Sequence, residues 1–321
     1  MIRCLMPGVQ TQSARKVEVA RHAGFCFGVK RAIRMVEGAL AAGAGPVTSL
    51  GPVIHNPQVV RSLEEKGLRR ASSLDEITDG VVVVRSHGAP PHVHTELQER
   101  GLAVVDATCP FVKKMHRQAR RLFKKGYRVV IVGDRNHSEI TSLTEDPAFA
   151  CLVAAGPGDL DGVKISGRVG LAAQTTQTQE NFQAVADRLL PEVLELRIFN
   201  TICDSTTTRQ TEARELALRS EVMVVIGGRN SANTRRLAEI CRETGTHTIW
   251  VETAEELSPE LIGSALRIGL TAGASTPQWI ITDVIRRLQS LPPEGTDAGT
   301  PLPHREESHT TGGSTEHVRR N

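Results

Sequence analysis

The stretch TCPFVKKMHRQARRLFKKGYRVVIVGDRNHSE, residues 108–139, contains one complete structural unit of this chain. After Cys109, apolar residues recur at helical spacing, and Gly126 stands where the helix should end. The run YRVVIVG then predicts a short buried strand, and the polar loop GDRNHSE follows its end. A helix, a strand and a polar loop in this order are typical of α/β proteins with parallel sheets.

The same unit occurs three times. A cysteine precedes a predicted helix, and a glycine that ends the next strand follows 24 or 25 positions later: Cys26 and Gly51, Cys109 and Gly133, Cys203 and Gly227. The helices are predicted at residues 29–43, 112–126 and 208–220. We therefore expect an α/β fold with three pseudo-threefold-related α/β domains, each with a small parallel sheet, around a common centre. The expected domains are residues 17–109, 110–203 and 204–290.

Polar side chains follow the predicted strands. Each unit reaches a second apolar strand that ends in small or polar residues, in VVVVRSHG (81–88), GLAAQTT (170–176) and IGLTAGAS (268–275). In parallel α/β sheets, residues just beyond the strand C-termini line the ligand crevice. The residues expected there are His55, His87, His137, Glu139, Thr175, Ser231, Asn233 and Ser275.

Cys26, Cys109 and Cys203 each precede a predicted helix, where the helix dipole favours the thiolate form that metals require. Three buried core cysteines are the alternative interpretation, but equivalent placement in three units favours a shared metal site. Three thiolates suit a four-iron four-sulfur cluster whose fourth iron stays open, as in catalytic metal sites. Zinc remains an alternative, although the closely spaced cysteine pairs typical of structural zinc are absent. Cys4, Cys151 and Cys241 fit a leader or a core better.

The polar set predicts an anionic ligand. Imidazoles, hydroxyls, an amide and backbone N–H groups are phosphate or diphosphate partners. Glu139 is the only carboxylate in this set of residues and is the expected proton donor. Taken singly, each histidine would more often be an ordinary loop residue, and Glu139 an ordinary surface glutamate.

Composition excludes several classes of function. Aromatic residues make up 3% of the 321 residues, too few for base-stacking platforms. The net charge is only +3, and the basic residues are scattered through the helices instead of concentrated in one run. Neither a Walker motif nor a dinucleotide-binding motif is present. No apolar run reaches the roughly 20 residues of a membrane span, and the start lacks a signal-peptide core. We expect a cytoplasmic protein without nucleic-acid or membrane partners. Residues 1–16 are expected to form a loose leader and residues 291–321 a disordered tail.

Nine motifs occur in order along the chain: HAGFCFGVKRAI, VIHNPQVV, RSHGAP, DATCPFVKKMH, NHSE, QTT, TICDSTTTRQ, RNSANTRRL and TAGASTP. With them the sequence resembles the 4-hydroxy-3-methylbut-2-enyl diphosphate reductase (LytB) family from about residue 17 to 290. The resemblance implies an iron-sulfur oxidoreductase that carries out the last step of the non-mevalonate (MEP) isoprenoid pathway. The implied reaction removes an allylic hydroxyl with two electrons and two protons, and yields isopentenyl and dimethylallyl diphosphate.

The resemblance also implies roles for the site residues. Cys26, Cys109 and Cys203 would hold one 4Fe-4S cluster. The diphosphate would be bound by His55, His87, Ser231, Asn233 and Ser275, with His137 in the matching histidine loop. Glu139 would relay protons, and Thr175 would lie by the substrate hydroxyl. A ferredoxin or flavodoxin is the implied electron donor.

The sequence departs from the family pattern at two loop positions. Ala232 stands where a second serine is common, which removes a hydroxyl from the expected diphosphate site. Ser138 stands where proline is frequent, which is expected to loosen the loop that carries Glu139. Two other functions remain open: an iron-sulfur hydro-lyase, which would need no external reductant, and an iron-sulfur redox-sensing protein, which would tolerate loss of Glu139 and Thr175.

Overall fold

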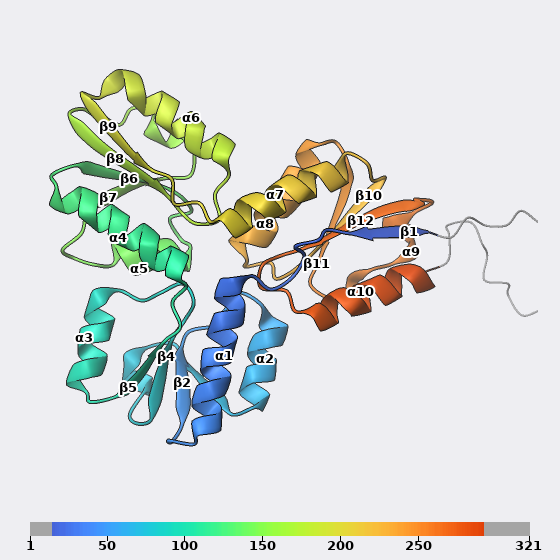
Figure 1. Ribbon diagram of the computed structural model, residues 1–321, viewed down its shortest axis with the longest axis horizontal. Coiled ribbons are helices and arrows are strands. Elements are labelled where there is room, and N and C mark those ends of the chain that lie inside the picture. The colour runs from blue at the N-terminus through green and yellow to red at the C-terminus, as the bar shows by residue number, and fades with distance from the viewer. Residues whose placement is uncertain (1–14, 292–321) are drawn as a thin grey trace, which may run out of the picture.

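The structure is a computed structural model, and it describes residues 15–291. Three lobes meet at a common centre, each built on one four-stranded sheet with helices on both faces (Figure 1). All strand pairs within these sheets are parallel. The predicted fold class is therefore confirmed.

The first lobe has the strand order β3-β2-β4-β5. Its elements are α1 (Phe27–Ala42), β2 (Val47–Leu50), α2 (Pro57–Glu65), β3 (Leu68–Ala71), β4 (Val81–Val84), α3 (Pro91–Glu99) and β5 (Ala103–Asp106), with a 3-10 turn at Leu74–Glu76.

The second lobe repeats this order as β7-β6-β8-β9. Its elements are α4 (Pro110–Lys124), β6 (Arg128–Val132), α5 (Ser138–Thr144), β7 (Cys151–Ala154), β8 (Arg168–Ala173), α6 (Gln179–Leu189) and β9 (Glu195–Phe199), with 3-10 turns at Pro157–Leu160 and Leu190–Glu192.

The third lobe takes one strand from the beginning of the chain, in the order β11-β10-β12-β1. Its elements are β1 (Lys16–Val19), α7 (Asp204–Ala217), β10 (Val222–Ile226), α8 (Ala232–Glu243), β11 (His247–Val251), α9 (Pro259–Ile262), β12 (Arg267–Ala272) and α10 (Gln278–Ser290), with a 3-10 turn at Ala254–Glu256.

The position of β1 corrects the expected boundaries at both ends. Lys16, expected in a loose leader, pairs with Arg267 of β12, and Val17 pairs with Ile268. Residues 17–19 therefore belong to the third sheet and not to the first domain. Leu291, expected to open a disordered tail, is buried in the core of the third lobe. The rest of the expected leader and tail, residues 1–14 and 292–321, lies outside the described residues.

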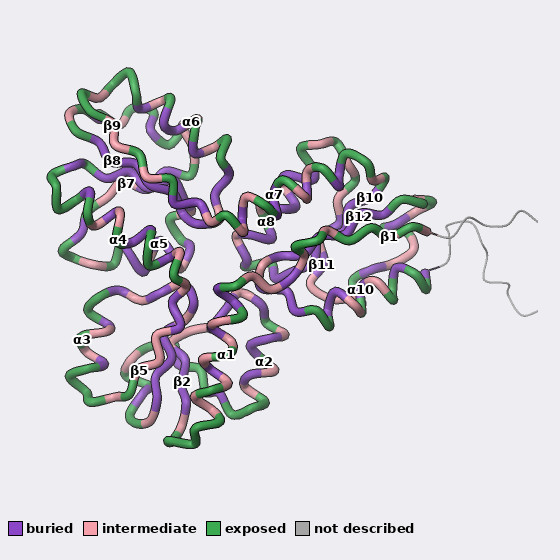
Figure 2. Tube along the Cα trace, in the orientation of Figure 1, coloured by how far each residue is buried: buried purple, intermediate pink, exposed green. Residues whose placement is uncertain are grey.

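The central strands of each sheet are apolar because helices cover both of their faces. In β4 the side chains of Val81 and Val83 pack in one hydrophobic cluster with α1 and α2, while Val82 and Val84 pack in another with α3. This alternation follows from the two-residue period of a strand. Figure 2 shows the central strands of the sheets buried, and the edge strand β1 and the outer helix faces exposed. Among residues 15–291, no helix combines the length and apolar character needed to cross a membrane.

The predicted helices begin two to four residues earlier than expected. Cys26, Cys109 and Cys203 are the N-cap residues of α1, α4 and α7. The apolar pattern alone did not reveal these first turns, because the residues after each cysteine do not follow the helical apolar spacing. Two of the expected ends are confirmed: Gly43 caps α1 with a φ of 62°, and Gly126 follows α4 with a φ of 77°. The third helix, α7, ends at Ala217, three residues before the expected end at residue 220.

Candidate active site

Each of the three N-cap cysteines joins two lobes. The amide of Cys109 donates to the carbonyl of Ser86, which follows β4 in the first lobe, at 2.9 Å. Equivalent bonds join Cys203 to Thr175, after β8, at 3.0 Å, and Cys26 to Ala274, after β12, at 3.1 Å. Every cysteine therefore hydrogen-bonds the loop at the end of one sheet while it begins the first helix of the next lobe. The three thiols lie at the junctions between lobes and not within them.

The first turns of the helices act on the thiols. The amide of Val29 donates to Cys26 Sγ at 3.5 Å. The amides of Phe111 and Val112 favour the thiolate of Cys109, yet burial is the larger effect and raises the pKa of Cys109 to about 11. Burial likewise raises the pKa of Cys203. The expectation that the helix termini lower the thiol pKa is therefore wrong for these two residues in the protein alone.

The three sulfurs do not form a site for a single metal ion. Among residues 15–291, the one group of three His, Cys, Asp or Glu side chains placed to hold one ion is His55, His87 and His137, and the cysteines form no such group. The three thiols therefore fit separate irons of one cluster better than a single zinc ion.

Gly28 leaves room between two of the thiols. A Cβ atom at this position would lie 2.6 Å from Cys109 Sγ and 3.9 Å from Cys26 Sγ. No side chain is compatible with the first distance unless the sulfur moves. Sequence reasoning did not select Gly28, although its place two residues after Cys26 in FCFG was a usable signal.

Three histidines from two lobes form one aromatic cluster. His55 and His87 stack with ring centroids 4.1 Å apart, and His137 contacts both edgewise at 5.2 and 5.5 Å. Burial lowers the pKa of His55 and His137 to about 4, and it holds the pKa of His87 well below its usual value. The rings are therefore neutral at pH 7. Their ligand atoms lie within 4.8 Å of one another, so a single ligand can contact all three.

The loop at residues 133–139 also sets the tautomer of His137 and contacts His55. His137 Nδ1 accepts a hydrogen bond from the amide of Glu139 at 3.1 Å, which leaves the proton of the neutral ring on Nε2. The hydroxyl of Ser138 lies 3.1 Å from His55 Nε2. Ser138 thus ties this loop to the first lobe, in contrast to the looser loop expected from its departure from the family pattern.

Glu139 is buried, with 2% of its surface exposed. Its Oε1 accepts from the amide of Thr175 at 2.9 Å, and its Oε2 accepts from the Thr175 hydroxyl at 2.8 Å. Burial raises the pKa of Glu139 to about 7, although both bonds from Thr175 act in the opposite direction. A carboxyl group with a pKa near neutrality is suited to donate a proton.

The third lobe contributes hydroxyl and amide groups. The hydroxyl of Ser275 donates to the carbonyl of His55 at 3.0 Å, and Ser231 is the N-cap of α8. The side-chain nitrogen of Asn233 and the Nδ1 of His87 are buried without a hydrogen-bond partner. Two buried polar atoms without partners indicate that a polar ligand belongs here.

All of these groups line one central cavity, which offers about 110 Å³ to water-sized molecules. Its lining includes every site residue expected from the sequence: Cys26, His55, His87, Cys109, His137, Glu139, Thr175, Cys203, Ser231, Asn233 and Ser275. Ser86, Thr176, Ser205 and Thr206 also line it and were not selected, because common hydroxyl residues give no signal on their own. Ala232, the other departure from the family pattern, lies at the wall beside Ser231.

Comparison with known proteins gives one consistent result. The family model described as LytB protein matches residues 17–289. A 4-hydroxy-3-methylbut-2-enyl diphosphate reductase of Pelobacter propionicus is 45% identical over 277 residues, which cover 86% of this chain and 98% of that protein. The enzyme of the same name from Aquifex aeolicus is 44% identical over 278 residues, covering 85% and 96%.

Solved structures agree with these relatives. One described as (E)-4-hydroxy-3-methyl-but-2-enyl diphosphate reductase, the terminal enzyme of the non-mevalonate pathway, is 42% identical, with a TM-score of 0.63 over 86% of this chain and all of that one. The Plasmodium falciparum reductase structure is 23% identical, covers 85% of this chain and 87% of its own, and with a TM-score of 0.80 shares the fold. On the family match and the curated relatives, the chain belongs to the LytB family.

Proposed function

We propose that this protein is a 4-hydroxy-3-methylbut-2-enyl diphosphate reductase, an oxidoreductase of the MEP isoprenoid pathway. The reaction removes the allylic hydroxyl of the substrate with two electrons and two protons, and it yields isopentenyl diphosphate, dimethylallyl diphosphate and water. The curated relatives that bear this name align over nearly their whole length.

The observation that carries this proposal is the meeting of three chemistries in one cavity. Three thiols, a cluster of neutral imidazoles and a buried carboxyl group with a pKa near 7 all line the same small space. A metal site alone would not need the anion-binding groups. An anion site alone would not need three cysteines placed equivalently at three lobe junctions.

Each group has a proposed task. Cys26, Cys109 and Cys203 would hold a four-iron four-sulfur cluster, which when bound supplies electrons and an open coordination position. The Nε2–H group of His137 would donate to a diphosphate oxygen. His55 and His87, with Ser231, Asn233 and Ser275, would complete the diphosphate site.

The buried carboxyl group would supply a proton. Protonated Glu139 would donate it to the departing hydroxyl oxygen, which leaves as water. Thr175 would keep the carboxyl group oriented through its two hydrogen bonds and lie beside the substrate hydroxyl. Diphosphate binding, remote from the reacting carbon, would position the hydroxyl near Glu139.

Anaerobic purification would test the cluster. We expect about four irons and four acid-labile sulfides per chain, since four of each form the proposed cluster. Cys26→Ser, Cys109→Ser and Cys203→Ser should each lower the iron content. Cys151→Ser is the matched control, because Cys151 lies at the start of β7, outside the cavity. Zinc, or no metal after anaerobic reconstitution, would contradict the proposal.

A turnover assay separates this reaction from the two alternatives. The reductase should consume the diphosphate substrate only when an external reductant is present. A hydro-lyase would form product without one. A redox-sensing protein would bind its cluster and show no turnover. Its response to a change of redox state would be unaffected by Glu139→Gln. The expected cytoplasmic location is a prediction that fractionation of cells expressing the tagged protein would test.

A further inference from the structure

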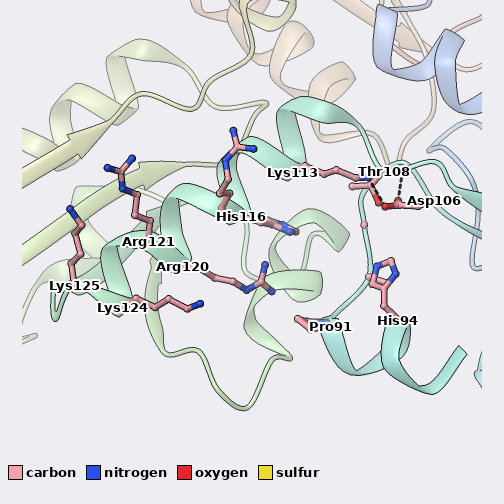
Figure 3. A pocket seen from close by; sticks show the side chains of 13 residues that line it. Pro91, His94, Asp106, Thr108, Lys113, His116, Arg120, Arg121, Lys124 and Lys125 are labelled. Atoms are coloured by element: carbon pink, nitrogen blue, oxygen red, sulfur yellow. Dashed lines mark hydrogen bonds and ion pairs between the residues drawn. The ribbon is translucent and has the colours of Figure 1, made fainter. Parts of the chain in front are cut away.

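A second, larger cavity lies outside the catalytic site. It is an open groove of about 760 Å³ between α3 and α4, on the outer side of the loop that carries His87. In Figure 3 the basic side chains of α4 lie along one wall, and Pro91 and His94 of α3 lie at the end near Thr108. Nothing in the proposed reaction uses this groove directly.

The groove is strongly basic. Six lysines and arginines line it, and Asp106 is its single carboxylate. Two of the cations are neutralised, because Lys113 pairs with Asp106 at 2.5 Å and Arg120 pairs with Asp146 at 3.2 Å. Among residues 15–291, no carboxylate forms an ion pair with the other four, which are Arg117, Arg121, Lys124 and Lys125.

These four cations form a single face of α4 and the residue after it. They recur at i, i+4, i+7 and i+8, which is the spacing of one side of a helix, and all four are exposed. Like charges four residues apart destabilise a helix. The view that basic residues are merely scattered over the helices is therefore wrong, because the fold concentrates them here although the whole chain carries a net charge of only +3.

The inner end of the groove shares a wall with the catalytic cavity. Gly88 and Thr108, which line the groove, directly follow His87 and precede Cys109 in the sequence. His116, also in the groove, bonds the carbonyl of Glu139 through Nε2 at 2.9 Å. A molecule seated in the groove would thus lie against the chain segment that holds one of the proposed cluster ligands.

We propose that this groove is the docking surface for an acidic protein that carries a one-electron cofactor. The inference rests on the proposed function, because that reaction consumes two electrons for which the chain has no nicotinamide or flavin motif. The substrate carbon takes up both electrons as the C–O bond breaks, and two protons balance the water and the new C–H bond. Two carrier molecules, each oxidised by one electron, therefore dock for every turnover.

The chemistry of the groove favours a protein over nucleic acid. Its lining contains no Phe, Tyr or Trp, so it offers no ring on which a base could stack. Unpaired, exposed cations that surround an opening are the arrangement that accelerates association with an acidic partner. Such a surface governs the association rate and its dependence on salt.

The test is a charge-reversal triple variant of the groove, Arg117→Glu with Arg121→Glu and Lys124→Glu, compared with the wild-type holoenzyme. A matched control reverses three exposed cations outside the groove, Arg34→Glu, Arg69→Glu and Arg286→Glu, so that both variants change net charge equally. Turnover is measured with a reduced acidic ferredoxin, with a reduced acidic flavodoxin, and with dithionite or reduced methyl viologen, which need no docking surface.

The groove variant should lose about tenfold or more in kcat/KM for the protein donors at low salt. Its turnover with small reductants and its KM for the substrate should stay at the wild-type level. The control variant should lose far less with the protein donors. Raising the ionic strength should slow the wild-type reaction with the protein donors and reduce the difference between the variants.

Several results would overturn the proposal. If the groove variant turns over with dithionite and keeps wild-type kinetics with both protein donors, the docking surface is excluded and the proposed function stands. A wild-type enzyme that accepts neither protein donor would also exclude the docking surface. Loss of binding to a short single-stranded RNA with unchanged donor kinetics would identify a nucleic-acid surface instead. No turnover with any reductant would overturn the proposed function, and this inference with it.

Discussion

The two carboxylate oxygens of Glu139 both accept hydrogen bonds from a single residue, Thr175, one from its amide at 2.9 Å and one from its hydroxyl at 2.8 Å. The hydrogen bond from the backbone amide survives most substitutions at position 175, whereas the hydrogen bond from the hydroxyl depends on the side chain. Burial and these bonds act on the same carboxyl group in opposite directions, so its pKa of about 7 is a balance that substitutions can shift.

Glu139→Gln should lower kcat by about 10² to 10⁴, the range expected when a general acid is lost. The amide has nearly the shape of the carboxyl group but donates no acidic proton. Iron content and the affinity for inorganic diphosphate should stay within a few-fold of wild type. Steady-state kinetics and iron analysis on the same preparation would check this, and a variant with wild-type kcat would show that another group donates the proton.

The activity should fall as pH rises through about 7. Glu139 must be protonated to act as the acid, so kcat/KM should be level below its pKa and fall tenfold per pH unit above it. Thr175→Val removes the hydroxyl bond to the carboxylate and should move this fall to higher pH, whereas Thr175→Ser should keep it in place. Pre-steady-state rates with reductant in excess would measure the profile. A fall that persists unchanged in Glu139→Gln would assign it to a different group.

Binding of diphosphate should take up protons. The free imidazoles are neutral at pH 7 because burial lowers the pKa of His55 and His137 to about 4. An anion beside them favours their protonated forms, so affinity should increase as pH falls toward 6. Calorimetry of inorganic diphosphate in two buffers of different ionisation enthalpy would count the protons. His55→Gln and His137→Gln should each reduce the uptake; equal uptake in wild type and both variants would exclude these two histidines as its source.

Gly28→Ala should impair cluster assembly, since the added Cβ would lie 2.6 Å from Cys109 Sγ. Iron per chain should fall several-fold relative to wild type after the same anaerobic reconstitution. Gly38→Ala is the matched control in the same helix, because no atom lies within 4 Å of its added Cβ. The control should keep its iron and gain up to about 1 kcal/mol in stability. Full iron in Gly28→Ala would show that the sulfur moves freely.

Ala232→Ser should tighten diphosphate binding by about tenfold or more, as expected for one hydrogen bond to a charged group. Residue 232 begins α8 at the cavity wall, beside the N-cap Ser231. Ala232→Val adds bulk without a hydroxyl and is the control for size. Calorimetric titration with inorganic diphosphate would compare the three proteins. Equal affinities for Ser and Ala would mean that backbone N–H groups already complete this part of the site.

The repeat and the proximity of the site residues were both predictable from the sequence. In a parallel sheet all strand C-termini lie at one edge, so the repeat predicts an equivalent polar edge in each of the three sheets. A pseudo-threefold arrangement then brings the edges after β4, β8 and β12 to one centre. The cysteine spacing fixed that repeat without knowledge of any contact. His87, Thr175 and Ser275 were accordingly predicted as neighbours, although they lie far apart in the sequence.

Other features depend on three-dimensional packing that no local pattern reports. The four residues of β1 carry too little periodic signal to indicate a partner about 250 positions away. The pKa of Cys109 is raised because of burial, which a helix start does not reveal. The helical spacing of Arg117, Arg121, Lys124 and Lys125 indicates the basic face of α4. The net charge of the whole chain does not reveal it, because acidic residues elsewhere cancel these charges.

The place of β1 has a consequence for how the protein is made. In the chain, β5 directly precedes Cys109 and β9 directly precedes Cys203. In the same way β1 precedes Cys26, and it is the fourth strand of the third lobe. During synthesis this strand emerges before the first two lobes, whereas its partner β12 follows both of them, about 250 residues later. The first two lobes can therefore fold as they leave the ribosome, but the third sheet cannot be completed until β12 has been made. Closure of the ring, and with it the meeting of all three thiols, has to follow the synthesis of β12.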